Sequence, residues 1–326
     1  MKVKQEDSIF QYRYQQPIRL YWLKRLSYPI CNLFLHILTR IIPNKKRTNR
    51  FYFSLVLIFK DEAPFLKEWI EYHLILGVDH FYLYNNNSSD HYLTVIQPYM
   101  DRDIITLVDW PEYPGQYSAY LHWYQSYRQE TQWASFIDAD EFLCPILEVS
   151  LRDVMKRYEK YPVILAYWKL FGTNGQLMHD DNRLIIEQYT HCRPKLFSEG
   201  KIIYNTRFDA ASDFISMHGL ETKWHGIKIP PLNTFGKFVI WDFHSAGRHA
   251  KAVLQINHYW SKAYNCWENK YEKGSIEKGT KYKDFNFFKN LELACTSTDK
   301  TIWRYLTLLK IKLKEQENLN NFITNK

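Results

Sequence analysis

Strand-like and helix-like segments alternate from residue 51 to residue 172, and this alternation constrains the fold more than any other feature of the sequence. Residues 51–60, FYFSLVLIFK, form a strongly apolar run, and residues 61–77 follow with Pro64 in their first turn and Gly77 at their end, as in a helix. The pattern then repeats, with strands expected at 78–85, 103–110, 133–143 and 162–172 and helices at 91–100, 116–130 and 150–158. Such alternation predicts an α/β fold with a Rossmann-type, mostly parallel central sheet flanked by helices.

Beyond residue 172 the pattern loosens into short strands and loops, and helical segments return near 261–273 and 299–316. The 326 residues are 46% hydrophobic and 24% charged, which is typical of folded globular proteins. We therefore expect one α/β domain at 51–275, preceded by a basic and apolar segment at 1–50 and followed by a helical extension at 276–326.

The net charge of +8 is concentrated at the N-terminus. Residues 1–50 contain 11 Lys and Arg against two acids, whereas the remaining 276 residues carry 32 basic and 33 acidic side chains. A nucleic-acid enzyme would carry its basic surface on the catalytic domain, so nucleic acid is not expected as a partner. The five cysteines are widely spaced with no CxxC pair, which argues against a disulfide framework or a zinc site and favours a reducing compartment.

The segment 26–42, LSYPICNLFLHILTRII, is the most apolar part of the N-terminal region. It is short for a membrane span and is interrupted by polar residues and a proline, and no cleavable signal peptide is visible before it. The basic sequence NKKRTNR follows, and an apolar segment beside basic residues suits the surface of an anionic membrane. Two interpretations stay open: a peripheral contact with the cytoplasmic face of a membrane, or a helix packed on the catalytic domain.

Polar residues follow the predicted strands at the points where the strands end. They are Lys60, Asp61 and Glu62 after the first strand, residues 85–90 after the second, Asp109 near the end of the third, and Asp138, Asp140 and Glu141 in the fourth. In open α/β sheets ligands bind beyond the carboxyl ends of the strands, so these residues are expected on one ligand-binding rim. Other interpretations remain: residues 60–62 could cap the next helix, and NNNSSD could form an Asx-type turn.

The most informative of these stretches is FIDADEFL, residues 136–143. Alternation along a strand would place Asp138 and Asp140 on the same side, and carboxylate oxygens suit Mn²⁺ or Mg²⁺. Neither GxxxxGKS/T nor GxGxxG occurs in the sequence, so a metal ion rather than a glycine-rich loop is expected to hold a diphosphate. Glu141 is either part of the same cation site or a solvated acid at the strand end.

The sequence resembles glycosyltransferase family 92, also described as domain of unknown function 23, and more broadly the GT-A fold. The likeness begins at LVLIFKDEAPFLKEWIEYHLILGVDHFYLYNNNSSD and continues through DADEFL, WKLFGTNG, HCRPKLF and INHYWSKAYNCWENKYEKG, covering roughly residues 54–275. The resemblance implies a GT-A-like enzyme that transfers a sugar, with inversion, from a UDP- or GDP-sugar donor to a glycan or lipid-linked acceptor.

The resemblance also implies roles for particular residues. Asp138 and Asp140 correspond to the metal-binding DxD motif, and His258, in the element INHYW, is a candidate third ligand or else an ordinary core histidine. Residues expected near the nucleotide are Lys60, Glu62, Asn87 and Asp90, to which we add the strand-end acid Asp109, and Trp168 and Gly172 belong to the acceptor-side element.

Two departures from the family pattern concern charge. Asp61 stands where asparagine is usual, and Asn265 and Cys266 occupy a usually acidic pair, which leaves the donor and an acid/base role open. An inverting transferase needs a base to deprotonate the acceptor hydroxyl. The candidates downstream of the fifth strand are Asp180, Asp181, Asp209, Asp213 and His218, of which we take Asp213, near His218, as the candidate catalytic residue.

Two other functions fit the same residues. Asp138 and Asp140 could be the carboxylate pair of a glycosidase or phosphodiesterase, since a glycosidase needs two carboxyl groups about 5 to 10 Å apart. A non-catalytic, membrane-associated carbohydrate-binding protein would suit the 11 Trp, 25 Tyr and 20 Phe, whose faces can stack on sugars. The leading hypothesis is a metal-dependent hexosyltransferase of polysaccharide or lipopolysaccharide biosynthesis, peripheral on the inner face of a membrane.

Overall fold

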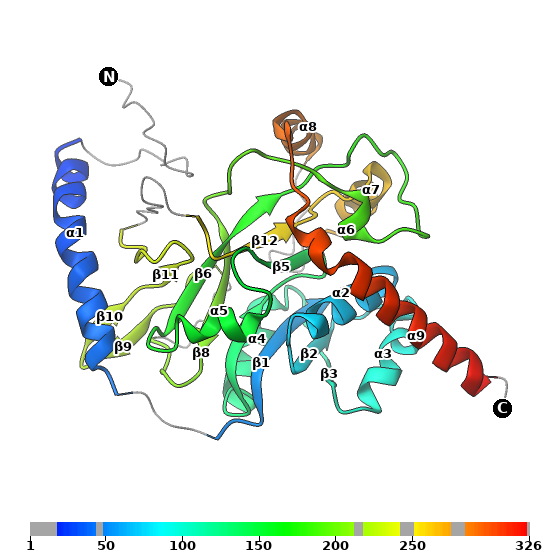
Figure 1. Cartoon of the computed structure of the whole chain (residues 1–326), viewed down its shortest axis with the longest axis horizontal. Coiled ribbons are helices and arrows are strands. Elements are labelled where there is room, and N and C mark those ends of the chain that lie inside the picture. Colours follow the sequence, from blue (N-terminus) through cyan, green and yellow to red (C-terminus); the bar gives the residue numbers. More distant parts are fainter. Residues whose placement is uncertain (1–17, 44–47, 212–217, 242–250, 275–283, 325–326) are drawn as a thin grey trace.

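The computed structural model describes residues 18–43, 48–211, 218–241, 251–274 and 284–324 (Figure 1). Within them the central sheet has nine strands in the order β3-β2-β1-β4-β8-β6-β12-β5, with β11 beside β6. The strands are β1 (Phe51–Phe59), β2 (His80–Asn85), β3 (Ile105–Asp109), β4 (Thr131–Phe136), β5 (Glu141–Pro145), β6 (Val163–Leu170), β8 (Gly200–Asn205), β11 (Leu232–Asn233) and β12 (Leu254–His258).

The first half of the chain forms the parallel part of this sheet. β1 lies between β2 and β4, β3 lies on the far side of β2, and all three pairs are parallel. The connecting helices are α2 (Ala63–Ile75), α3 (Tyr92–Met100) and α4 (Gln116–Ser126). β8 runs antiparallel between β4 and β6, and β5 runs antiparallel at the edge beside β12. The predicted fold class, a mostly parallel Rossmann-type sheet flanked by helices, is confirmed.

Alternate residues of β1 enter two different cores, because successive side chains of a strand face opposite sides of the sheet. Leu55 and Leu57 pack in the core that contains the buried residues of α2 and α3, whereas Val56 and Ile58 pack in a second core with residues of α4. All four side chains are buried. Because both faces of the strand are covered, its sequence is a continuous apolar run rather than an alternating one.

The predicted fourth strand, 133–143, is wrong as a single element. β4 ends at Phe136 and β5 begins at Glu141, and β8, β6 and β12 lie between these two strands in the sheet. The residues between them form a turn, in which the Glu141 N–H donates to the Asp138 carbonyl (3.0 Å) and the Asp138 N–H donates to Glu141 Oε2 (2.9 Å). Asp138 and Asp140 therefore do not share a side through strand alternation; the turn sets their directions.

The remaining elements lie outside the central sheet. They are α5 (Leu151–Lys156) before β6, and after β6 α6 (Ile185–Gln188), β7 (His191–Cys192), β9 (Thr222–Trp224), β10 (Ile227–Ile229), α7 (Tyr264–Lys273), α8 (Phe285–Ala294), β13 (Ser297–Thr298), η1 (Thr301–Tyr305) and α9 (Leu306–Thr324). The helical segments expected near 261–273 and 299–316 are confirmed as α7 and as η1 with α9. α9 packs against α2.

The apolar N-terminal segment is a helix, α1 (Ile18–Ile41), at the opposite end of the molecule from α9 (Figure 1). One side of α1 packs on the α/β domain through Tyr28, Leu35 and Leu38, which are buried. The packed-helix interpretation is therefore correct for this side. Among the described residues, no helix combines the length and the apolar character needed to cross a membrane.

Candidate functional site

Strands β1, β2 and β3 end together at one edge of the sheet. The parallel register places Phe59 opposite Asn85, and Asn85 opposite Asp109. Lys60 to Glu62 follow β1 directly, and the turn with Asp138 and Asp140 follows β4, which pairs with β1. The predicted rim is thus present, and its loops are bonded to one another: the Ser89 N–H donates to Asp61 Oδ1 (2.7 Å).

The residues predicted near the nucleotide have different surroundings on this rim. Asp90 accepts hydrogen bonds from the backbone N–H groups of Ala63 (2.8 Å) and Tyr92 (3.3 Å), so it caps the start of α2. Asp109 accepts from Asn85 Nδ2 (3.0 Å). Asn87 is exposed, Lys60 and Glu62 are half-buried, and Glu62 makes no capping hydrogen bond to α2. Glu62 is the N-cap residue of α2, as the capping alternative expects, although its side chain makes no capping hydrogen bond.

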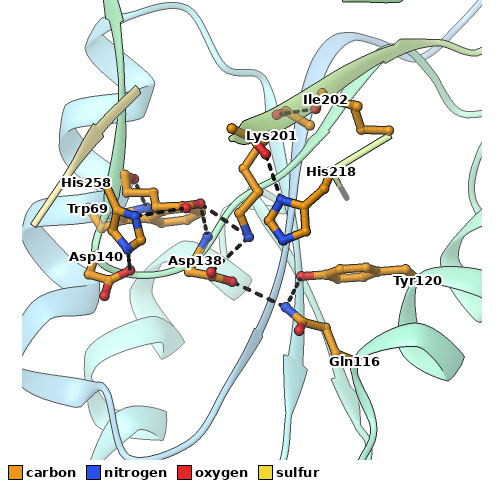
Figure 2. Close-up of polar contacts among 12 residues, drawn as sticks. Trp69, Gln116, Tyr120, Asp138, Asp140, Lys201, Ile202, His218 and His258 are labelled. Atoms are coloured by element: carbon orange, nitrogen blue, oxygen red, sulfur yellow. Dashed lines mark hydrogen bonds and ion pairs between the residues drawn. The ribbon is translucent and has the colours of Figure 1, made fainter. Parts of the chain in front are cut away.

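Asp138 is paired with a buried lysine that the sequence analysis did not identify. Lys201 Nζ lies 2.8 Å from Asp138 Oδ2 and 3.5 Å from Glu141 Oε2, and its side chain is 1% exposed (Figure 2). Burial alone would lower the pKa of Lys201, but the charges of Asp138 and Glu141 raise it above its ordinary value. On the other side of Asp138, Gln116 Nε2 lies 3.4 Å from Oδ1. Lys201 is therefore a fixed positive charge beneath the turn.

Gly200 allows Lys201 to reach this position. A Cβ atom at Gly200 would lie 1.9 Å from the Ala166 carbonyl oxygen, so only glycine permits the close approach of β8 to β6 at this point. A lysine beside a glycine in the otherwise apolar run GKIIY was the one sequence signal for this residue, and it lies 63 residues after Asp138.

Asp140 lies in a different environment from Asp138. Its carboxylate is 5% exposed and pairs with Lys270 of α7, and Oδ1 lies 3.5 Å from His258 Nε2. Burial would raise the pKa of Asp140, but Lys270 and His258 hold it well below its usual range. Burial lowers the pKa of His258, which favours a neutral imidazole. Figure 2 shows Asp140 and His258 on one side of Asp138 and Gln116, Tyr120 and His218 on the other.

Glu141 is not a solvated acid at a strand end, and that alternative is excluded. Its side chain is fully buried, and burial raises its pKa well above the usual range. Oε2 accepts the Asp138 N–H, and Oε1 lies 3.7 Å from His258 Nδ1. Glu141 therefore shapes the turn and lies beside the histidine.

Of the residues at this site, Asp140 and His258 are best placed to bind a divalent cation. Asp140 Oδ1 accepts no hydrogen bond from any described residue, although it is buried and faces His258 Nε2. Carboxylate oxygen suits Mn²⁺ or Mg²⁺, whose remaining positions are commonly filled by water and substrate phosphates, and an imidazole nitrogen beside the carboxylate favours Mn²⁺ over Mg²⁺. Asp138 is directed to Lys201 instead, and no group of three acidic, histidine or cysteine side chains is arranged to hold a metal within the described part of the chain.

A cavity of about 210 Å³ opens beside Asp140, between the β1–α2 loop and α7. It is lined by Asp61, Glu62, Pro64, Phe65, His179, Asp181, Lys262, Asn265, Cys266, Asn269, Lys270 and Lys273. Lys270 both lines the cavity and pairs with Asp140, and Lys273 Nζ donates to the Asp61 carbonyl oxygen (2.8 Å). Three lysines beside three acids make the cavity suitable for a charged, polar ligand.

The residues considered as the catalytic base lie in different parts of the structure. Asp213 lies outside the described residues. Asp209 pairs with Arg128 (3.3 Å), and Asp180 accepts from the Asn182 N–H (3.0 Å). His218 Nδ1 contacts the Gly200 carbonyl oxygen at 2.7 Å. Trp168, which the resemblance places in the acceptor-side element, has its ring centroid 4.8 Å from that of His258 and 5.3 Å from that of His218.

The helix motif LKEWIEYH of α2 forms hydrogen bonds with the backbone of β5 next to the acidic turn. Trp69 Nε1 donates to the Glu141 carbonyl oxygen (2.9 Å), Tyr72 O–H donates to the Leu143 carbonyl oxygen (2.7 Å), and the Leu143 N–H donates to His73 Nε2 (3.2 Å). Glu68 accepts from the N–H groups at the start of α6. The motif thus fixes the backbone of β5 next to the acids.

Glu68 gives a test of this buried scaffold. Burial raises its pKa from 4.5 to about 7, so the folded state binds more protons than the unfolded state between these values, and the free energy of unfolding falls as the pH rises through this range. In Glu68→Gln this contribution is absent. Relative to the parent chain, the stability of the variant should therefore rise by up to about 3 kcal/mol from pH 4.5 to pH 7, measured by urea denaturation. A constant difference across this range would contradict the assignment.

Comparisons with known proteins agree with the motifs. The sequence profile of glycosyltransferase family 92 matches residues 51–286. A glycosyltransferase family 92 protein of Ricinus communis is 27% identical over 216 residues, which are 65% of this chain and 35% of that protein. One of Oryza sativa subsp. japonica is 36% identical over 109 residues, 33% of this chain and 18% of that protein. The chain therefore spans about a third or less of the length of these two relatives.

Among solved structures, the crystal structure of S. aureus TarS 1-349 in complex with UDP is similar over 48% of this chain and 47% of that chain, with 16% sequence identity and a TM-score of 0.32. A likeness at this level carries no argument about the site. The profile match extends over most of the chain and includes the strand-end loops, the acidic turn and His258, and on this basis the chain belongs to glycosyltransferase family 92.

Proposed function

We propose that this chain is a glycosyltransferase that transfers a hexose from a nucleotide-sugar donor, UDP- or GDP-linked, to a glycan or glycolipid acceptor with inversion. The observation that carries the proposal is that Asp140, which faces His258, pairs with Lys270 in the lining of a cavity at the carboxyl edge of the sheet. Membership of the family supports the reaction class. Ligands of open α/β sheets bind at this edge.

In this proposal the donor extends along the rim. The nucleotide contacts the loops that contain Lys60, Glu62, Asn87, Asp90 and Asp109. The diphosphate lies near Lys262, Lys270 and Lys273, whose charges oppose the negative charge that develops as the sugar leaves. Asp138, held by Lys201, orders the turn and would add negative charge near a cation held by Asp140 and His258.

Mn²⁺ or Mg²⁺ would be held by Asp140 and His258 together with the donor phosphates, and would supply positive charge that stabilises the diphosphate leaving group. Asp213 is the proposed base that removes the proton from the attacking acceptor hydroxyl. Trp168 is buried and packs against both His258 and His218, so it can position these two rings at the site. The reaction is proposed to take place at the cytoplasmic face of a membrane, in the synthesis of a polysaccharide or lipopolysaccharide.

A panel of nucleotide sugars, screened by thermal unfolding with and without Mn²⁺, tests the proposal. A donor at 100 times its dissociation constant should stabilise the folded chain by about 2.7 kcal/mol, and the stabilisation should require Mn²⁺. Release of free nucleotide from the same donor then reports turnover. Cleavage of a glycoside or phosphodiester with no nucleotide present would favour the carboxylate-pair hydrolase instead, and glycan binding without any turnover would favour the carbohydrate-binding protein.

A further inference from the structure

The outward side of α1 is apolar from Trp22 to Ile41. Residues 22, 26, 30, 33, 37 and 41 follow one another at intervals of three and four, which places them on one side of the helix. They are Trp22, Leu26, Ile30, Leu33, Ile37 and Ile41, with exposed fractions between 44% and 73%, and we call them the α1 outer face. A helix side that faces water would carry polar residues instead, and exposed apolar patches of this extent commonly mark interaction surfaces.

The opposite side of α1 is fixed on the α/β domain by polar contacts as well as by packing. Tyr28 O–H donates to the Phe238 carbonyl oxygen (2.8 Å), and the Phe238 N–H donates to Asn32 Oδ1 (3.0 Å). His36 Nδ1 lies 3.0 Å from Tyr161 O–H. These contacts prevent the helix from rolling about its axis. The α1 outer face therefore stays exposed, and Figure 1 shows α1 at one end of the molecule, with the sheet on one side of it.

The charges around this face indicate what covers it. The sequence of α1 contains Arg19, Lys24, Arg25 and Arg40 and no acidic residue. The chain on both sides adds further basic residues, so that residues 1–50 carry 11 Lys and Arg against two acids. An apolar stripe with basic flanks complements a bilayer that contains anionic lipids, since headgroups attract the cations and the acyl region accepts the apolar side chains. Two copies packed face to face would bring these positive charges together.

The aromatic residues at one end of the helix agree with this assignment. Trp22 is 44% exposed and Trp241, near Lys24, is 40% exposed. Tryptophan is enriched at the boundary between headgroups and acyl chains, because its ring is apolar and its N–H is polar. Since α1 lacks the apolar character to cross a bilayer, a contact of this kind runs along the surface.

We propose that the α1 outer face binds the surface of a membrane that contains anionic lipids, with α1 parallel to the membrane plane. That the contact is with the cytoplasmic face of a membrane rests on the proposed function. The membrane contact itself does not require transferase activity. The α/β domain would then be held at a fixed orientation to the lipid surface, because α1 is rigidly joined to it.

Co-sedimentation of the full chain with vesicles tests this proposal. Binding is expected to vesicles of phosphatidylcholine mixed with phosphatidylglycerol, and to weaken in high salt and on pure phosphatidylcholine. The triple variant Leu26→Gln, Ile30→Gln, Ile37→Gln should bind at least about tenfold more weakly. Its matched control is Leu308→Gln, Ile311→Gln, which changes exposed apolar residues of α9 and should leave binding unchanged.

Two results would overturn the proposal. One is equal vesicle binding by the triple variant and the control. The other is a dimer, seen by analytical ultracentrifugation, that the triple variant dissociates while the parent chain does not bind vesicles, since a second copy would then cover the face. Far-ultraviolet circular dichroism checks that the variants are folded. Nucleotide-sugar binding in the thermal panel is measured separately, so failure of the membrane contact and failure of the transferase proposal can be told apart.

Discussion

Replacing Asp140 by asparagine is expected to lower sugar transfer at least about 100-fold, while the chain stays folded. The amide has nearly the shape of the carboxylate but lacks its charge, so the proposed cation would lose its carboxylate ligand beside His258. Lys270, the other partner of Asp140, is 25% exposed and can turn to water when its ion pair is lost. The loss should therefore appear in turnover and in Mn²⁺-dependent stabilisation by the donor rather than in the free energy of unfolding.

Asp103→Asn is the matched control for this variant. Asp103 also pairs with a cation, Arg50, but both side chains are well exposed at the surface. This control should retain full activity. Undiminished transfer by Asp140→Asn would remove Asp140 from the proposed site, and equal losses in the two variants would show that the effect is not specific to the rim.

Replacing Lys201 by methionine is expected to lower the free energy of unfolding by about 3 to 5 kcal/mol, because it leaves Asp138 and the buried Glu141 without their cation. Methionine fills a similar volume, so packing is largely kept. Urea denaturation at neutral pH measures the change. In the double variant Lys201→Met, Glu141→Gln the buried acid is neutral, and part of the loss should be recovered.

The comparison with Lys228→Met separates burial from simple ion pairing. Lys228 pairs with Glu221 at 2.8 Å, the same distance as Lys201 and Asp138, but its side chain is 63% exposed. A surface pair of this kind contributes about 1 kcal/mol or less, so Lys228→Met should be nearly neutral. If Lys201→Met cost no more than Lys228→Met, the buried lysine could not be the residue that holds the acidic turn.

The fold could be predicted from the sequence to the extent that its patterns are local. The run 51–60 is apolar because β1 is covered on both faces, and the helix signals at Pro64 and Gly77 correspond to α2 and its end. The same logic failed at 133–143. Two apolar runs joined by a short acidic turn have the pattern of one strand, although β4 and β5 occupy distant places in the sheet.

The positions of the candidate site residues along the sheet edge could be predicted because they follow from local strand and helix patterns, whereas their contacts with distant segments could not. The sequence by itself determined that Lys60 to Glu62, Asn85, Asp109 and the acidic turn lie on one rim, since parallel strands joined by helices end at a common edge. Only the tertiary structure decided what faces each acid. Lys201 and Lys270 reach Asp138 and Asp140 from segments 63 and 130 residues away.

This difference between what the sequence determines and what the tertiary structure decides has one physical reason. Strand and helix periodicities depend on neighbouring residues and are visible in any short window of sequence. The ionisation, burial and pairing of FIDADEFL depend instead on β8, β12 and α7, whose positions follow from how the whole sheet is assembled. The stretch determined where the carboxylates would be, and the assembled fold decided that Asp138 is held by a lysine, that Glu141 is buried in the turn, and that Asp140 faces a histidine.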